Sequence, residues 1–292
     1  EEAPVVLVRG LRLRIQSETP APDATTALAT SNYRTRIRRG DGETRLFHCI
    51  DAEQLVYESN EQTPEVHYGT FWADWTQPGA RGLCVTIHQA HQNFPKAFGV
   101  DAAGMDVWLY PDCCPPLRLR QGVARTQRIL LHPHAGDTGA ADAGTRSLQF
   151  QMPDRPTLRP ETYRDARVFE DVWVERRVER VEAALTDAAD QRVRGYGMLH
   201  WGDGPDADYT NQGRGHGKPV WTNNEYDLPH AAMLMFARTG ERRMLDYLLV
   251  TAEHQMDVDV CHFSNDPLRQ DGQIAHSADH VTGSCVPSHQ WV

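Results

Sequence analysis

One short segment of this chain is dense in side chains that bind ligands and transfer protons. From Trp221 to Ala231 it reads Trp-Thr-Asn-Asn-Glu-Tyr-Asp-Leu-Pro-His-Ala. Amide, carboxylate, phenol and imidazole groups are costly to bury without hydrogen-bond partners, so their concentration favours a ligand site over a packed interior. More than half of the 14 histidines also lie after residue 199, around this string. We therefore predict a binding or catalytic site here.

A second polar segment runs from His254 to His262 and reads His-Gln-Met-Asp-Val-Asp-Val-Cys-His. On a continuous helix, His254, Asp257 and Cys261 would share one face. Divalent metals take such ligands, but the spacing matches neither HExxH nor a paired CxxC pattern. We favour an imidazole–carboxylate pair that orients a catalytic histidine or a substrate hydroxyl, and we expect no metal and no cofactor.

A third group of histidines lies near the end of the chain, in a segment that Gly272, Gly283 and Pro287 mark as a loop. Its members are His276, His280 and His289, the last within Ser288-His-Gln-Trp291. The chain has no GxSxG elbow, phosphate loop or dinucleotide fingerprint. Acyl transfer through a serine and nucleotide chemistry are therefore disfavoured.

Composition limits the class of partner. The 292 residues are 40% hydrophobic and 24% charged, as in soluble globular proteins. A net charge of −10 argues against nucleic acid and against membrane surfaces, and no apolar run approaches the roughly 20 residues of a membrane-spanning helix. The six cysteines show no regular spacing and suggest free thiols, which leaves the compartment open; we favour an extracytoplasmic location over a cytoplasmic one.

Two kinds of element must position these groups. Short apolar runs, such as Leu46–Ile50 and Leu83–Ile87, recur up to about residue 150, and several alternate with polar residues, as at Leu11–Ile15. This pattern predicts an antiparallel β-sandwich. Beyond Pro153–Pro160 the apolar spacing becomes helical. We expect helices over about 169–188, 225–238 and 241–261, and thus a β domain at 1–155 and a helical domain at 160–292.

Two local interpretations remain open. Pro229 must lie in the first turn of its helix, so Asn224 or Asp227 is expected to cap that helix. Trp72 and Trp75, in Phe-Trp-Ala-Asp-Trp, suit either the core of the sandwich or a platform on which a sugar stacks.

Together, these strings resemble the exo-acting rhamnogalacturonan lyases, the family that includes the YetA-like proteins. The resemblance rests on Gln92-Asn-Phe-Pro-Lys96, on Trp221 to His230, on His254 to His262, and on His276, His280 and Ser288-His-Gln-Trp291. It implies that residues 1–155 form a central antiparallel β-sandwich and residues 160–292 the first part of an α/α toroid. On this interpretation the sequence is truncated at both ends.

The resemblance also implies cleavage of rhamnogalacturonan-type pectin by β-elimination at galacturonate, between C4 and O4. The reaction needs a base for the C5 proton, an acid for O4, and donors that hold the carboxylate as the enolate forms. The chemistry of the side chains suggests His230 or Tyr226 for one proton transfer and His262 or His289 for the other. Expected substrate contacts are Arg214, Lys218, Trp221, Asn223, Asn224, Glu225, His254, His276 and His280.

Two alternatives stay open. A glycoside hydrolase on a similar toroid would use paired carboxylates from Glu225, Asp227, Asp257 and Asp259. A carbohydrate-binding fragment would bind the acidic polysaccharide or oligosaccharide without turnover.

Overall fold

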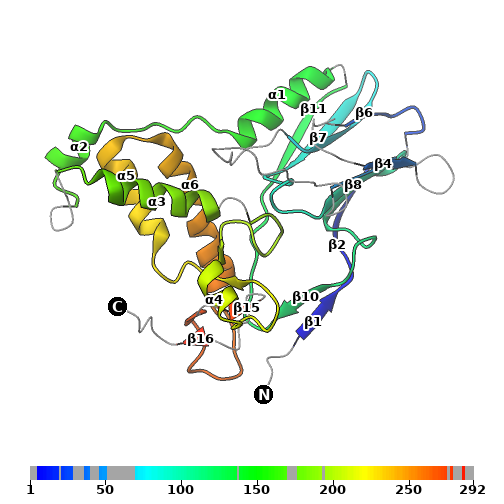
Figure 1. The fold of residues 1–292 in the computed structure, drawn as a ribbon. Helices are drawn as coiled ribbons and strands as arrows, with labels where there is room; N and C mark the ends of the chain where they lie inside the picture. Colours follow the sequence, from blue (N-terminus) through cyan, green and yellow to red (C-terminus); the bar gives the residue numbers. More distant parts are fainter. Residues whose placement is uncertain are drawn as a thin grey trace.

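The computed structural model describes residues 5–19, 21–28, 36–39, 46–50, 70–136, 138–169, 176–192, 195–274, 277–278 and 285–286. Every structural statement below concerns these ranges. The fold is mixed β and α: a strand-rich part comes first along the chain and a helical part follows (Figure 1). All of the sheets are antiparallel, as the alternating apolar pattern predicted.

Two sheets dominate the strand-rich part. One has the order β2-β9-β8-β5-β4 and the other the order β11-β7-β6-β3, and a separate pair joins β1 to β10. The strands are β1 (Val5–Val8), β2 (Leu11–Gln16), β3 (Thr25–Leu28), β4 (Arg36–Arg39), β5 (Leu46–Ile50), β6 (Trp72–Gln77), β7 (Arg81–Ile87), β8 (Lys96–Asp101), β9 (Gly104–Tyr110), β10 (Leu117–Arg120) and β11 (Ile129–Ala135). The predicted runs Leu11–Ile15, Leu46–Ile50 and Leu83–Ile87 coincide with β2, β5 and β7 to within two residues.

Side chains from both sheets meet in one hydrophobic core, which includes Val85, Phe98 and Trp75. Trp72 faces a smaller core against helix α1 (Ala140–Gln151), which the sequence did not predict. Both tryptophans are buried, so the core interpretation of this pair is confirmed. The helix is held by polar contacts that no apolar pattern reports, such as the 2.6 Å hydrogen bond between Ser147 and Thr86.

The helical part is built on helices α5 and α6, which pack against each other. Its helices are α2 (Pro160–Asp165), α3 (Glu179–Arg192), α4 (Ala207–Asn211), α5 (Leu228–Thr239) and α6 (Arg242–His254). The predicted helix at 225–238 is confirmed: Asp227 caps it and Gly240 ends it in the left-handed conformation. The hydrophobic core of the helical part includes Trp201, Met244 and Tyr247.

The helix predicted over 169–188 is wrong at its start. The described helix α3 begins at Glu179, and Phe169 lies in a turn after α2. Val181 lies within the predicted range and is exposed, although its spacing from Phe169 and Leu185 suits an apolar helix face. Trp173 lies in the same predicted range but outside the described residues.

The helix predicted over 241–261 changes its winding before it ends. After His254 the chain forms a π-helix, η1 (Gln255–Asp259), and Val260 is already extended. His254, Asp257 and Cys261 therefore do not share a face. Because π-helical backbone bonds join residues five apart, Asp259 lies beside His254 instead.

Three short strands, β12 (Pro205–Asp206), β13 (Val220–Trp221) and β15 (Ser277–Ala278), form a small sheet, and β14 (Gln273–Ile274) pairs with β16 (Cys285–Val286). The small sheet carries the polar string at Trp221. Among the described helices, none is long and apolar enough to cross a membrane.

Candidate functional site

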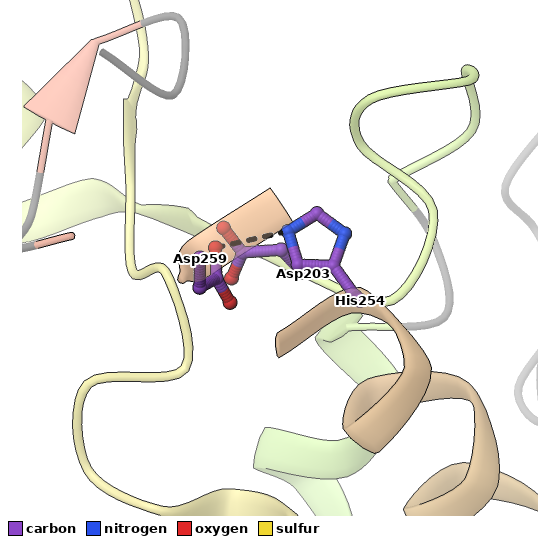
Figure 2. Close-up of side chains that lie close together, drawn as sticks. All are labelled: Asp203, His254 and Asp259. Atoms are coloured by element: carbon purple, nitrogen blue, oxygen red, sulfur yellow. Dashed lines mark ion pairs between the residues drawn. The ribbon is translucent and has the colours of Figure 1, made fainter. Parts of the chain in front are cut away.

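Three ionisable side chains meet where η1 contacts the loop after Trp201. Asp203, His254 and Asp259 each offer a ligand atom, and these atoms lie within 4.8 Å of one another (Figure 2). His254 Nε2 is 3.2 Å from Asp259 Oδ1, while its Nδ1 lies 2.9 Å from the Trp201 carbonyl. All three side chains are fully buried. This cluster, the Asp-His-Asp cluster below, is the centre of the candidate site.

Asp203 is held from three sides. Its oxygens accept hydrogen bonds from the backbone amide of Gly204 at 2.7 Å, the Thr222 hydroxyl at 2.6 Å and the backbone amide of Asn223 at 3.0 Å. These donors favour the carboxylate, whereas burial and the neighbouring Asp259 disfavour it. Burial and Asp259 prevail and raise the pKa of Asp203 to about 6.

For His254, burial and the neighbouring carboxylates shift the pKa in opposite directions. Burial lowers its pKa, but the carboxylates of Asp259 and Asp203 raise it further than burial lowers it, so the net direction is upward. A positive charge is therefore favoured at the centre of the cluster.

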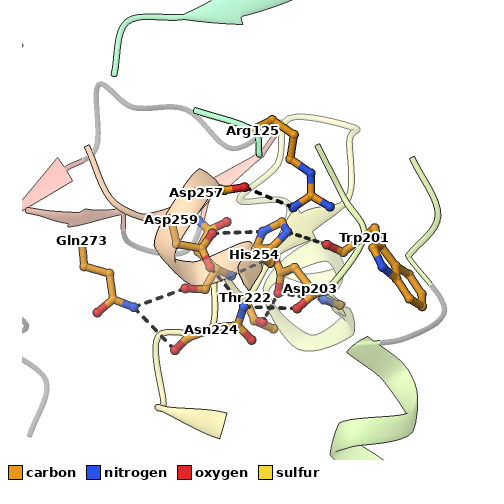
Figure 3. A network of polar contacts seen from close by, with 12 residues as sticks. Arg125, Trp201, Asp203, Thr222, Asn224, His254, Asp257, Asp259 and Gln273 are labelled. Carbon is orange, nitrogen blue, oxygen red and sulfur yellow. Dashed lines mark hydrogen bonds and ion pairs between the residues drawn. The ribbon is translucent and has the colours of Figure 1, made fainter. Parts of the chain in front are cut away.

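The Trp221–His230 string contacts this cluster, and three of its residues have positive φ. Asn223 and Asn224 have φ of 50° and 47°, and Asp227 has φ of 53°. Asparagine and aspartate tolerate this left-handed region better than most residues. The Asn224 amide nitrogen donates to Asp259 Oδ2 at 3.1 Å and to the Gly202 carbonyl at 3.2 Å (Figure 3). The two asparagines thus form the wall of the cluster.

The strand-rich part contributes a second layer. Arg125, buried, lies 3.9 Å from Asp257 and donates to Asn93, while Thr126 donates to both oxygens of Asp257. Lys96 is fully buried and donates to the carbonyls of Asn93 and Pro95. Burial and the nearby Arg125 hold the pKa of Lys96 well below its usual value. The Gln92–Lys96 string is therefore brought to the site from the other half of the chain.

An exposed layer lies over the buried one. The Arg214 guanidinium stacks 3.9 Å from the Tyr209 ring, and Trp221 stacks on His200 with ring centroids 4.3 Å apart. Tyr226 is 64% exposed. Local burial and the neighbouring Tyr209 raise the pKa of Tyr226, although Arg214 opposes this effect. His230 Nδ1 lies 3.4 Å from Asp227 Oδ2 and is half exposed.

The predicted site residues fall into three groups. Asn223, Asn224, Glu225 and His254 are buried; Arg214, Lys218, Trp221, Tyr226, His230 and His262 reach the surface at least in part; His276, His280 and His289 lie outside the described residues. His262 also contacts the Asp257 carbonyl through Nε2, at 3.1 Å.

Sequence reasoning missed Asp203, Thr222 and Arg125. Asp203 lies in His-Trp-Gly-Asp-Gly, between two glycines of which Gly202 has φ of 102°. A Cβ on Gly202 would approach the His254 Cβ to 2.6 Å. An acidic residue next to a conformationally required glycine was the one available signal.

The chain was compared with known proteins. No protein-family model matches it, and no curated protein matches it either.

Proposed function

We propose that this chain is part of a polysaccharide lyase that cleaves rhamnogalacturonan-type pectin by β-elimination at galacturonate. On this proposal the two large sheets are a central β-sandwich, and the helices are the first part of an α/α toroid. The substrate lies over the exposed layer formed by Tyr209, Arg214, Trp221, Tyr226 and His230. The observation that carries the proposal is the grouping of an exposed phenol with a cation held on an aromatic ring.

Arg214 is the group best suited to the galacturonate carboxylate. Its stacking on Tyr209 orients the planar guanidinium, which binds carboxylates through two parallel hydrogen bonds. Holding that carboxylate stabilises the charge that develops when the C5 proton leaves. Lys218 and Trp221 lie in the same part of the chain and supply a second cation and a stacking surface.

The sequence suggested Tyr226 and His230 as alternatives for one transfer, whereas on this proposal the two share both proton transfers. A phenol with an ordinary pKa of about 10 is protonated at neutral pH, so Tyr226 can donate a proton to O4 as the C4–O4 bond breaks. His230, oriented by Asp227 through Nδ1, can accept the C5 proton at Nε2. The electrons of the C5–H bond then form the C4–C5 double bond. His262 and His289 remain the alternative partners for one of these transfers.

Burial favours this assignment over a glycoside hydrolase. Of the four carboxylates that the hydrolase would need, Glu225, Asp257 and Asp259 are buried. Asp257 is also occupied by hydrogen bonds from Thr126. Only Asp227 remains exposed, whereas hydrolysis requires a pair that flanks the sugar.

The test is an assay of rhamnogalacturonan oligosaccharides for the near-ultraviolet absorbance of a conjugated double bond. Tyr226→Phe is expected to lower turnover by about 10²–10⁴-fold, because the proton donor is lost. Arg214→Gln is expected to lower it by about 10²–10³-fold through loss of charge stabilisation. Tyr163→Phe, in the helical core beside Phe236, is the matched control and should leave turnover unchanged. Full activity of Tyr226→Phe would remove Tyr226 from the mechanism.

A further inference from the structure

Beneath the proposed substrate surface, we propose that the Asp-His-Asp cluster binds one divalent cation of the zinc type, with the Asn224 side-chain oxygen as a further ligand. The cation is structural: it is fully enclosed and holds the wall that carries Tyr226 and His230. The elimination itself needs no metal. The proposal therefore stands or falls independently of the lyase assignment.

The hydrogen bond to the Trp201 carbonyl decides which histidine nitrogen is available. A carbonyl oxygen only accepts, so His254 Nδ1 carries a hydrogen. In the neutral ring Nε2 then has a lone pair, and it faces Asp259 Oδ1 at 3.2 Å. A charged ring would donate from Nε2 to Asp259, whereas with the neutral ring proposed here the two electron-rich atoms need a cation beside them. Metal-binding histidines show the same arrangement, with the second nitrogen donating to a carbonyl or carboxylate.

The spacing of the cluster suits a small cation. Ligand atoms about 2.1 Å from a metal, at tetrahedral or octahedral angles, lie roughly 3.0–3.4 Å apart. The 3.2 Å separation of His254 Nε2 from Asp259 Oδ1 falls in that range, and the Asp203 ligand atom lies within 4.8 Å of both. A modest contraction would complete the coordination. One imidazole with two carboxylates favours zinc or manganese over calcium or magnesium.

Charge balance supports the same conclusion. Asp203 and Asp259 are both fully buried, and an isolated buried carboxylate is strongly unfavourable. A divalent cation with a neutral His254 neutralises the two carboxylates. Arg125, the nearby buried guanidinium, lies 3.9 Å from a third carboxylate, that of Asp257.

An independent observation comes from Asn224, which is fully buried. Its nitrogen donates to Asp259 Oδ2, while its oxygen has no hydrogen-bond partner within the described structure. A buried amide oxygen normally accepts a hydrogen bond or binds a metal. The nitrogen of the same side-chain amide contacts Asp259 (Figure 3), and on this proposal the unpartnered oxygen binds the cation held by Asp203, His254 and Asp259.

The experiment measures metal in the purified chain, followed by thermal unfolding after chelation and on addition of Zn²⁺, Mn²⁺, Ca²⁺ or Mg²⁺. We expect about one equivalent of metal and a midpoint that rises with the logarithm of the Zn²⁺ or Mn²⁺ concentration. Co²⁺ bound in place of zinc should give visible absorption bands from nitrogen and oxygen ligands, a readout that does not depend on stability.

Three variants complete the test. Asp259→Asn should abolish the metal, and Thr222→Val, which loses a donor to Asp203, should weaken binding by about 10–100-fold. Asp266→Asn is the matched control, because Asp266 lies in an exposed pair with Arg269 and should retain full binding. Wild-type chain without bound metal, without a midpoint shift for any cation and without Co²⁺ bands would overturn the proposal, and so would unchanged binding by Asp259→Asn.

Discussion

Two of the histidines that the structure describes lie between a carboxylate and a backbone carbonyl. His254 is one, and His134 in strand β11 is the other, with Nε2 2.6 Å from Asp74 and Nδ1 2.7 Å from the Ala135 carbonyl. Since both His134 nitrogens face acceptors, the charged ring satisfies both contacts. Burial alone lowers the pKa of His134, but these two contacts raise it further, and the net direction is upward.

The His134 pair predicts a pH-dependent stability. Because the folded pKa exceeds the unfolded value of about 6.5, the stabilisation is complete below that value and is lost as pH rises through the folded pKa. Comparing the unfolding free energies of wild type and His134→Gln by denaturant titration should show a difference of roughly 1–3 kcal/mol at low pH that shrinks at high pH. A difference that grows with pH would contradict the charged pair.

At the scale of elements, the sequence predicted strands better than it predicted helix boundaries. Strands with one polar face can be recognised in the sequence because apolar and polar residues alternate, as at Leu11–Ile15. The switch from α6 to the π-helix had no such signal, because the apolar residues Met244, Leu248, Ala252 and Met256 continue at a four-residue spacing through it. Met256 nevertheless ends on the surface. Tertiary contacts, including those of Asp257 and Asp259, set the winding there.

The cap of α5 offers a prediction at this scale. Asp227→Ala should destabilise the chain by about 0.5–2 kcal/mol, because the bond from the His230 amide is lost and φ of 53° is strained for alanine. Asp227→Gly should cost only a few tenths of a kcal/mol, since glycine adopts positive φ freely. Glu241→Ala provides the control, because the Glu241 side chain makes no capping bond to α6. If denaturant unfolding gave Asp227→Ala and Asp227→Gly the same loss of unfolding free energy, the role of backbone strain would be contradicted.

For the whole molecule, the contacts between the two halves assemble the site. Thr126 and Asp257 are 131 positions apart in sequence, and the Gly197 amide donates to the Gln92 carbonyl across the same junction. Local patterns predicted the Trp221–His230 string and singled out His254. They could not pair these residues with Asp203 or Arg125, because such contacts depend on how distant segments meet.

The contact between Thr126 and Asp257, which joins the two halves of the chain, yields a further prediction. Thr126→Val leaves an oxygen of the buried Asp257 without its hydroxyl donor, so it should cost about 1–3 kcal/mol of unfolding free energy and lower any metal or substrate binding in parallel. Thr145→Val, which removes an exposed helical hydroxyl contact, should stay within about 0.5 kcal/mol of wild type. Equal stability of the two variants would show that the junction does not depend on this contact.

The central claim, that the exposed layer around Tyr226 carries out an elimination, is tested most directly by turnover in water labelled with heavy oxygen. Elimination breaks the C4–O4 bond without adding water. The account therefore predicts that mass spectrometry will find unsaturated galacturonate ends without the label in either product. Label incorporated at a new reducing end would show hydrolysis, and bound oligosaccharide without any product would show a binding module; either result would contradict the account.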